Sequence, residues 1–154
     1  AYTKEIMGYC VGDTLGSCYT VEALEMAIER IRGIETKGLI HHSDRGVQYA
    51  SADYICVLRH NGILPSMTGN GNPKDNAIAE RVNGIIKNEL LQGIRFRSME
   101  EVQKTVAIAV HFYNNERPHM SLNMSTPVQA GKMEGPIKKK WISYRENYLS
   151  VAHA

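Results

Sequence analysis

Short apolar stretches alternate with longer amphipathic ones along the first half of the chain. Residues 5–11 (EIMGYCV) are rich in strand formers and alternate loosely, so they predict a strand. Short apolar segments at 38–42 and 63–66 predict two more strands. Apolar residues recur at helical spacing after Thr20 and after Ser51, each of which can cap a helix. This alternation predicts an α/β fold whose middle strands are at least partly parallel.

The second half of the chain is predicted to be mainly helical. Residues 68–76, rich in glycine and asparagine, predict a flexible loop, and a helix with one apolar face is expected at 77–91. The capping-box pattern at 98–101 (SMEE) opens another helix, which Pro118 stops. We expect the remainder to be irregular, apart from a short segment near 141–149.

The composition is that of a globular protein. The 154 residues suit one domain, and the shares of hydrophobic (43%) and charged (22%) residues are ordinary. No apolar run approaches the roughly 20 residues of a membrane span, and no secretory signal is visible. Three cysteines without metal-type spacing indicate reduced thiols, so we expect a cytoplasmic protein with no membrane partner. For the basic run at 138–140 we favour a solvated tail over a nucleic-acid contact.

A polar and charged stretch, HHSDRGVQYAS at 41–51, follows the apolar pair at 39–40. In α/β sheets, functional residues gather where strands end at their carboxyl edge. Asp44 is therefore in the expected place for a catalytic acid, although a strand running out into a surface loop has the same pattern. His41 and His42 are adjacent on a strand and point to opposite faces. We expect one of them to pack and the other to be buried or to face a ligand, rather than both to bind a metal.

A second carboxylate, Glu80, follows Asp44 with thirty-five residues between them. On a helical wheel it points away from the apolar stripe. It shares a polar face with Asn76, Asn83 and Lys87. A solvated face would have the same pattern, but the amides, the single acid and the adjoining Gly/Asn loop favour a site. Basic residues that could contact phosphate flank both acids: Arg45, Lys74, Arg81 and Lys87.

Three motifs in this order resemble those of bacterial insertion-sequence transposases, which are similar to retroviral integrases and share the ribonuclease-H-like fold. They are HSDRGVQY with Asp44, GNPKDNAIAERVNGIIKNEL with Glu80, and FYNNERPHMSLNMSTPVQA. The resemblance runs from about residue 2 to residue 130. It implies a partial integrase-type catalytic core at 1–130 and a basic C-terminal tail at 131–154.

The resemblance implies DNA transposition by metal-dependent phosphodiester cleavage and strand transfer at transposon ends. Asp44 and Glu80 would be the second and third acids of an Asp-Asp-Glu triad and would bind Mg²⁺ or Mn²⁺, with two ions in the complete domain. The expected partners are transposon-end and target DNA, and a second copy of the chain in a homo-oligomeric complex in a bacterial, nucleoid-associated setting. The expected DNA contacts are Arg45, Lys74, Asn76, Arg81, Asn83, Lys87, Arg117 and His119. For Arg117 and His119, a structural role at a helix end is an equal alternative.

The first acid of the triad is expected before residue 1, because 5–11 matches the family's third strand. Asp13, Asp53 and Asp75 are poor substitutes, since they fall in a turn, at a helix start and in the flexible loop. We therefore expect a core that is incomplete at its N-terminus, inactive alone, and left with exposed apolar sheet edges. Two other interpretations are a non-catalytic remnant that binds DNA or an intact transposase, and a structure-specific nuclease of the same fold.

Overall fold

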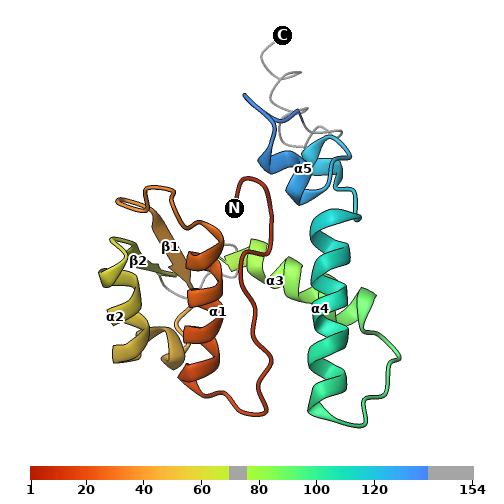
Figure 1. Ribbon diagram of the computed structural model, residues 1–154, viewed down its shortest axis with the longest axis horizontal. Helices are drawn as coiled ribbons and strands as arrows, with labels where there is room; N and C mark the ends of the chain where they lie inside the picture. The colour runs from red at the N-terminus through yellow and green to blue at the C-terminus, as the bar shows by residue number, and fades with distance from the viewer. Residues whose placement is uncertain (70–75, 139–154) are drawn as a thin grey trace. The chain divides into compact units, whose positions relative to one another are not determined.

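The structure, a computed structural model, describes residues 1–69 and 76–138 (Figure 1). The chain divides into two compact units: one is Ile6–Ala107, and the other combines Ala1–Glu5 with Ile108–Ala154. This division does not test the predicted domain boundary at residue 130, which stays a prediction. The elements in chain order are α1 (Ser17–Arg30), β1 (Ile40–Ser43), a 3₁₀ turn (Val47–Ala50), α2 (Ala52–His60), β2 (Leu64–Met67), α3 (Ala77–Gly84), a π-helical segment (Ile85–Leu90), α4 (Met99–Asn115), a 3₁₀ turn (Met120–Leu122) and α5 (Pro127–Gly131). In the described part of the chain, no helix is long and apolar enough to cross a membrane.

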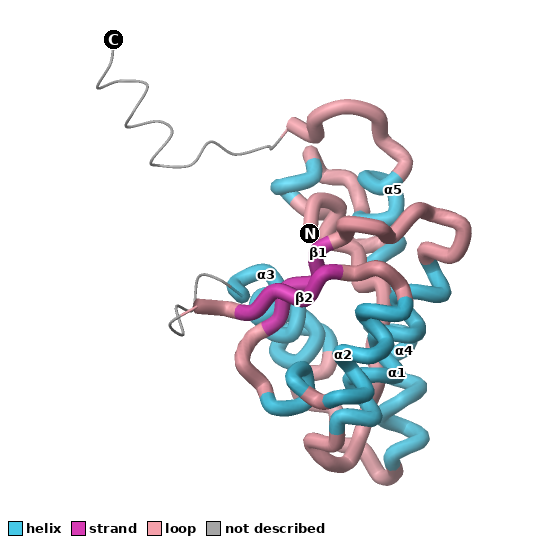
Figure 2. Tube along the Cα trace, turned by 90° about the vertical axis from the view of Figure 1, so that its left-hand side faces the viewer, coloured by secondary structure: helices cyan, strands magenta, loops and turns pink. Residues whose placement is uncertain are grey.

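β1 and β2 form a two-stranded parallel sheet (Figure 2). The register pairs Ile40 with Leu64 and Ser43 with Met67. Parallel strands need a crossover connection, and α2 supplies it. The predicted parallel arrangement is therefore confirmed. Each strand begins one or two residues later and ends one residue later than predicted.

The core of the Ile6–Ala107 unit lies where α1 and α2 pack on each other and α2 packs on β2 (Figure 1). Its buried members are Leu24, Tyr54, Leu58 and Ile63. The predicted cap of α2 is confirmed, because the Ser51 hydroxyl accepts the Tyr54 N–H at 3.4 Å. Gly62 follows the end of α2 with φ +67°, a conformation that suits glycine. This cap and this turn fix where the crossover enters and leaves the sheet.

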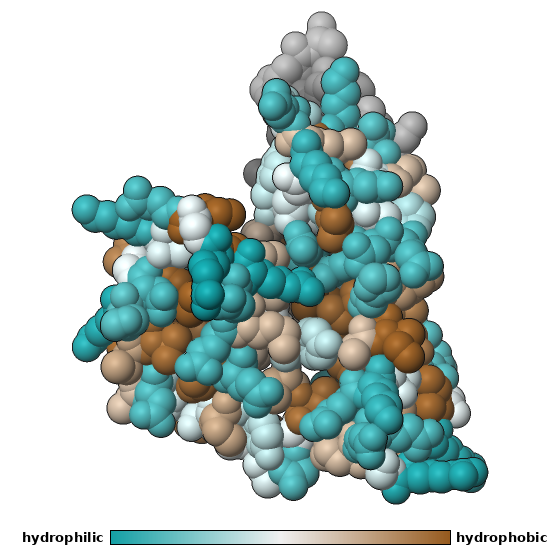
Figure 3. Space-filling model, in the orientation of Figure 1, coloured by the Kyte–Doolittle hydropathy of each residue, from teal (hydrophilic) through white to brown (hydrophobic). Residues whose placement is uncertain are grey.

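The other face of the sheet carries two exposed apolar side chains beside the polar pair His42 and Ser66. Ile40 and Leu64 are neighbours across the register and are 65% and 54% exposed. Parallel sheets are ordinarily covered on both faces, whereas these two apolar side chains are open to solvent. The expectation of exposed apolar sheet edges concerns unpaired strand edges and stays a prediction. Apolar side chains are also exposed on α4, among them Ile108 and Phe112. Figure 3 shows brown apolar atoms between teal polar ones on the visible face.

The strand predicted at 5–11 is wrong. This segment forms no strand and instead runs along α1, where the Arg30 guanidinium donates to the Ile6 carbonyl at 2.8 Å. At Gly8 the approach is so close that an added Cβ would lie 1.9 Å from the Ala23 carbonyl oxygen. A strand requires a neighbour to pair with, and no described strand pairs with this segment.

Two helix predictions need correction in detail. α1 begins at Ser17 rather than after Thr20, because the Thr20 hydroxyl donates to the Ser17 carbonyl at 2.7 Å inside the helix instead of capping it. The helix predicted at 77–91 is present as α3, which ends at Gly84, and the π-helical segment Ile85–Leu90 that follows it.

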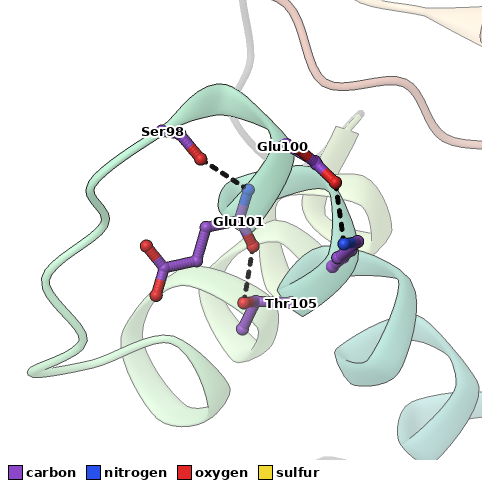
Figure 4. Close-up of polar contacts among 5 residues, drawn as sticks. Ser98, Glu100, Glu101 and Thr105 are labelled. Atoms are coloured by element: carbon purple, nitrogen blue, oxygen red, sulfur yellow. Dashed lines mark hydrogen bonds and ion pairs between the residues drawn. The ribbon is translucent and has the colours of Figure 1, made fainter.

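The start of α4 follows the predicted pattern, as Figure 4 shows. The Ser98 hydroxyl accepts the Glu101 N–H at 3.2 Å, and the Glu101 carbonyl accepts the Thr105 hydroxyl at 2.7 Å. The Glu101 carboxylate accepts the N–H of Arg97 rather than that of Ser98, one residue earlier than the usual capping box. The capping box therefore begins α4, with the Glu101 carboxylate bonded to the N–H of the residue before the N-cap.

The expectation of an irregular segment beyond Pro118 is wrong for residues 119–131, whereas residues 132–138 are irregular as predicted. His119 and Ser125 form an antiparallel bridge, and α5 follows it. The Thr126 hydroxyl accepts the Gln129 N–H at 3.2 Å, and the Gln129 side chain accepts the Thr126 N–H at 3.0 Å. This full capping box, with proline at the first helical position, makes a short helix stable. The predicted segment at 141–149 lies outside the described residues.

Candidate functional site

Asp44 is the first residue after β1, at the carboxyl end of the strand. Its Oδ1 accepts the Gly46 N–H at 2.8 Å, an Asx turn that fixes the carboxylate where the chain reverses. The residue is exposed. An anchored, solvent-facing carboxylate at a sheet edge is well suited to bind a cation.

The residues on either side of Asp44 hold the end of β2. The Thr68 N–H donates to the Ser43 carbonyl at 3.0 Å, which extends the parallel ladder past Met67. The Arg45 Nε donates to the Thr68 carbonyl at 3.1 Å. Both backbone groups of Thr68 are thus bound to residues that flank the acid.

An aromatic cluster of buried Tyr54 with half-buried His41 and Tyr49 lies behind β1. The His41 Nε2 and the Tyr54 hydroxyl are hydrogen-bonded at 2.8 Å, and the Tyr49 and Tyr54 rings meet edge to face at 5.4 Å. Burial, with a smaller effect of His42, lowers the pKa of His41. Burial raises the pKa of Tyr54, and burial followed by the Asp44 charge raises the pKa of Tyr49. The cluster is therefore neutral near pH 7 and supports the strand that carries the acid.

The two histidines of β1 differ as the strand geometry predicts. His41 packs against Tyr54, whereas His42 is exposed and its Nδ1 lies 3.0 Å from the Ser66 hydroxyl on β2. No local sequence pattern indicates the pairing of His41 with Tyr54, because thirteen positions separate them and Tyr54 resembles an ordinary residue of an apolar helix face.

Glu80 lies in the first turn of α3 and is exposed. Asn83 and Lys87 on its predicted polar face are exposed as well, and Asn76 is half-buried. β2 ends at Met67 and α3 begins at Ala77, so the connection from the sheet edge leads directly to Glu80. Within 1–69 and 76–138, no three His, Cys, Asp or Glu side chains are grouped to hold a metal.

The remaining candidate residues lie in different places. Arg81 is exposed on α3, whereas Lys74 lies outside the described residues. His119 belongs to the other unit, where its ring packs edge to face on the buried Tyr113 with centroids 4.9 Å apart. Arg117 is half-buried. The packing of His119 supports the structural one of its two predicted roles.

Comparison with known proteins identifies the family. Two family models, both described as "Integrase core domain", match residues 1–73 and 61–127. A putative transposase for insertion sequence element IS986/IS6110 of Mycobacterium tuberculosis is 35% identical over 133 residues, which is 84% of this chain and 48% of that protein. The chain belongs to the integrase core family of insertion-sequence transposases.

Further relatives agree with this assignment. The insertion element IS600 uncharacterized 31 kDa protein of Shigella sonnei is 39% identical over 82% of this chain and 46% of that protein. The transposase for insertion sequence element IS629, also of Shigella sonnei, is 33% identical over 82% of this chain and 42% of that protein. This chain thus spans about half the length of the relatives it matches.

Solved structures show the same fold. A chain of the simian T-cell lymphotropic virus intasome in complex with PP2A regulatory subunit B56 gamma has a TM-score of 0.63 and 18% identity, over 86% of this chain and 46% of that one. The HTLV-2 integrase catalytic core domain in complex with magnesium has a TM-score of 0.54 and 22% identity, over 78% and 71%. The fold is ribonuclease-H-like, as the sequence predicts.

Proposed function

We propose that this chain forms part of the catalytic core of a transposase that cleaves and joins DNA at the ends of an insertion sequence. The observation that carries the proposal is the placement of Asp44. It follows the carboxyl end of β1, and the parallel neighbour β2 leads through one connection to Glu80. This arrangement occurs in a chain whose relatives are named as transposases.

We propose that Asp44 and Glu80 bind a divalent cation. Both side chains are exposed carboxylates, and oxygen donors of this kind suit Mg²⁺ or Mn²⁺ better than zinc or copper. When bound, such ions stabilise charge on the oxygens that attack and leave the phosphorus. The magnesium in the HTLV-2 integrase core supports this choice of metal. A complete two-metal site is proposed for a longer chain that adds a third carboxylate, because two acids give too few bridging oxygens.

The other residues of the site would hold the DNA. Arg81 and Lys87 are exposed cations on the helix of Glu80, where they can contact backbone phosphates. Asn83 is exposed beside them and can donate to a phosphate or a base edge. Asp44 and Glu80 need no deep pocket for this purpose, since an open surface accepts a polymer. We propose that the active complex contains more than one copy of the chain.

Activity of the complete protein tests the proposal. Full-length protein carrying this segment should cleave 3′ ends and transfer strands on labelled DNA from its own element, in a Mg²⁺-dependent manner. Glu80→Gln should remove nearly all of this activity while DNA binding stays, because glutamine keeps the shape but loses the charge. Strand transfer by Glu80→Gln at the parent rate would show that Glu80 is not a catalytic acid.

The 154-residue chain distinguishes the alternative of a non-catalytic DNA-binding protein. We expect it to bind duplex DNA and not to cleave it, because it supplies two acids of the site. Lys87→Ala should weaken this binding and reduce its salt dependence by about one ion. Cleavage by the isolated chain, lost in Asp44→Asn, would show instead that these 154 residues hold a complete site.

A further inference from the structure

The helix that carries Glu80 changes its winding one turn after the acid. α3 keeps α-helical hydrogen bonds up to its end at Gly84. The segment that follows is π-helical, and the Leu91 N–H donates at 3.0 Å to the carbonyl of Ile86, five residues earlier. Each π turn takes in roughly one more residue than an α turn. Side chains beyond Gly84 therefore lie on different faces from those that α-helical periodicity predicts.

The change in winding brings Asn88 into line with Glu80. Gly84 lies one α-helical turn beyond Glu80, on the same side of the helix. In a continuous α-helix, Asn88 would lie about 80° from Glu80 around the helix axis, and Lys87 would lie closer to that line. The wider turns beyond Gly84 reduce the angle for Asn88 and turn Lys87 away. The Asn88 amide lies over Gly84, because a Cβ added at Gly84 would be 3.9 Å from Asn88 Nδ2.

Gly84 leaves a gap on this line between two polar side chains. Glu80 and Asn88 are both exposed, and the half-buried Gly84 between them has no side chain. Glycine allows another chain to approach the backbone closely. An amide Nδ2 beside such a gap can donate to a phosphate oxygen, and many contacts between proteins and DNA are hydrogen bonds of this kind. The gap and the amide together suit one strand of a nucleic acid.

We propose that Asn88 is a further DNA-contacting residue, whose amide holds a phosphate oxygen of a strand that passes over Gly84 beside Glu80. This inference rests on the proposed function, because the strand is the DNA on which Glu80 would act. The contacts expected from the sequence include Asn83 and Lys87 but not Asn88, since they follow α-helical periodicity through the whole of 77–91. Lys87 is exposed and keeps its proposed contact with a phosphate.

Two substitutions in the purified 154-residue chain test this contact, by fluorescence anisotropy with labelled DNA duplexes of two different sequences. Asn88→Ala removes the amide. Gly84→Ala fills the gap with a methyl group, which would meet Asn88 at an ordinary contact distance. Gln103→Ala, which removes an exposed amide from α4, is the matched control. Thermal unfolding of each variant shows whether the fold is kept.

Asn88→Ala should raise the Kd for both duplexes about two- to tenfold, the range for the loss of one hydrogen bond. Its salt dependence should stay at the parent value, because asparagine carries no charge. Gly84→Ala should also raise the Kd at least about twofold, because the methyl group stands where the strand passes. Its melting temperature should not fall, since alanine favours a helix more than glycine does. Gln103→Ala should match the parent.

A parent Kd in either Asn88→Ala or Gly84→Ala would overturn the proposal. If Lys87→Ala weakened binding in the same experiment, the proposed function would stand and the Asn88 contact alone would be wrong. A loss in Asn88→Ala that appeared with only one of the two duplexes would indicate a base contact and overturn the phosphate contact. Failure of the parent chain to bind either duplex would overturn its proposed DNA binding together with this contact.

Discussion

Replacing Asp44 by asparagine should separate metal binding from folding. The asparagine side chain retains a carbonyl oxygen that can accept the Gly46 N–H, which Asp44 Oδ1 now accepts at 2.8 Å. The turn is therefore kept, and the free energy of unfolding should change by less than about 1 kcal/mol. The negative charge, however, is removed from an exposed position at the end of β1.

The loss of metal affinity follows from that charge. A dication and a carboxylate at a Mg–O distance of about 2.1 Å attract each other by about 4 kcal/mol at the dielectric constant of water, which suits an exposed group. The amide oxygen of asparagine recovers part of this energy. Since about 1.4 kcal/mol is a factor of ten, Asp44→Asn should weaken Mn²⁺ binding at least about a hundredfold.

Isothermal titration of Mn²⁺ into the parent and variant chains measures the effect. Asp53→Asn is the matched control, because Asp53 is also an exposed aspartate but lies in the first turn of α2. It should bind Mn²⁺ as the parent does. An Asp44→Asn chain that kept the parent affinity, or an equal loss in Asp53→Asn, would refute the reasoning.

Three further predictions concern stability. Leu58→Ala should lower the free energy of unfolding by about 2–5 kcal/mol in urea titrations, because Leu58 is 1% exposed in the core. Leu15 is 92% exposed, so Leu15→Ala should lower it by under about 0.5 kcal/mol. The half-buried His41 has a lowered pKa, so the unfolded chain takes up a proton before the folded chain does as the pH falls below 6.5. The free energy of unfolding should therefore fall in that range, and fall less in His41→Gln. Thr126→Ala should cost about 0.5–2 kcal/mol by thermal unfolding, since the cap of α5 is lost. Equal stabilities of Leu58→Ala and Leu15→Ala would contradict the first prediction. Identical pH profiles with and without His41 would contradict the second, and an unchanged melting temperature of Thr126→Ala would contradict the third.

Local signals predicted the part of the fold that carries Asp44. Two short apolar segments and the Ser51 cap define β1, α2 and β2, because caps and strand ends depend on neighbouring residues. The strand at 5–11 was predicted wrongly, since pairing depends on distant partners that a local pattern does not contain. The TPVQ sequence at 126–129 matches the capping-box pattern, so the start of α5 is also a local signal.

The candidate site was predictable in position but not in its supports. The placement of Asp44 after a strand follows from fold topology, and that of Glu80 from helical periodicity. The hydrogen bond from Arg45 to the Thr68 carbonyl joins residues 23 positions apart, and the hydrogen bond between His41 and Tyr54 joins residues 13 positions apart. Only the folded chain reveals such contacts. The strength of these two hydrogen bonds depends on how far they are buried, and burial is set by the packing of the whole core.

Paramagnetic line broadening by Mn²⁺ tests most directly whether Asp44 and Glu80 share one metal ion. With the metal well below the protein concentration, NMR amide signals near both acids should broaden together in the parent chain. Either Asp44→Asn or Glu80→Gln should abolish the broadening at both places, because each acid is half of the same site. Broadening around one acid that persisted after substitution of the other would contradict a shared metal ion.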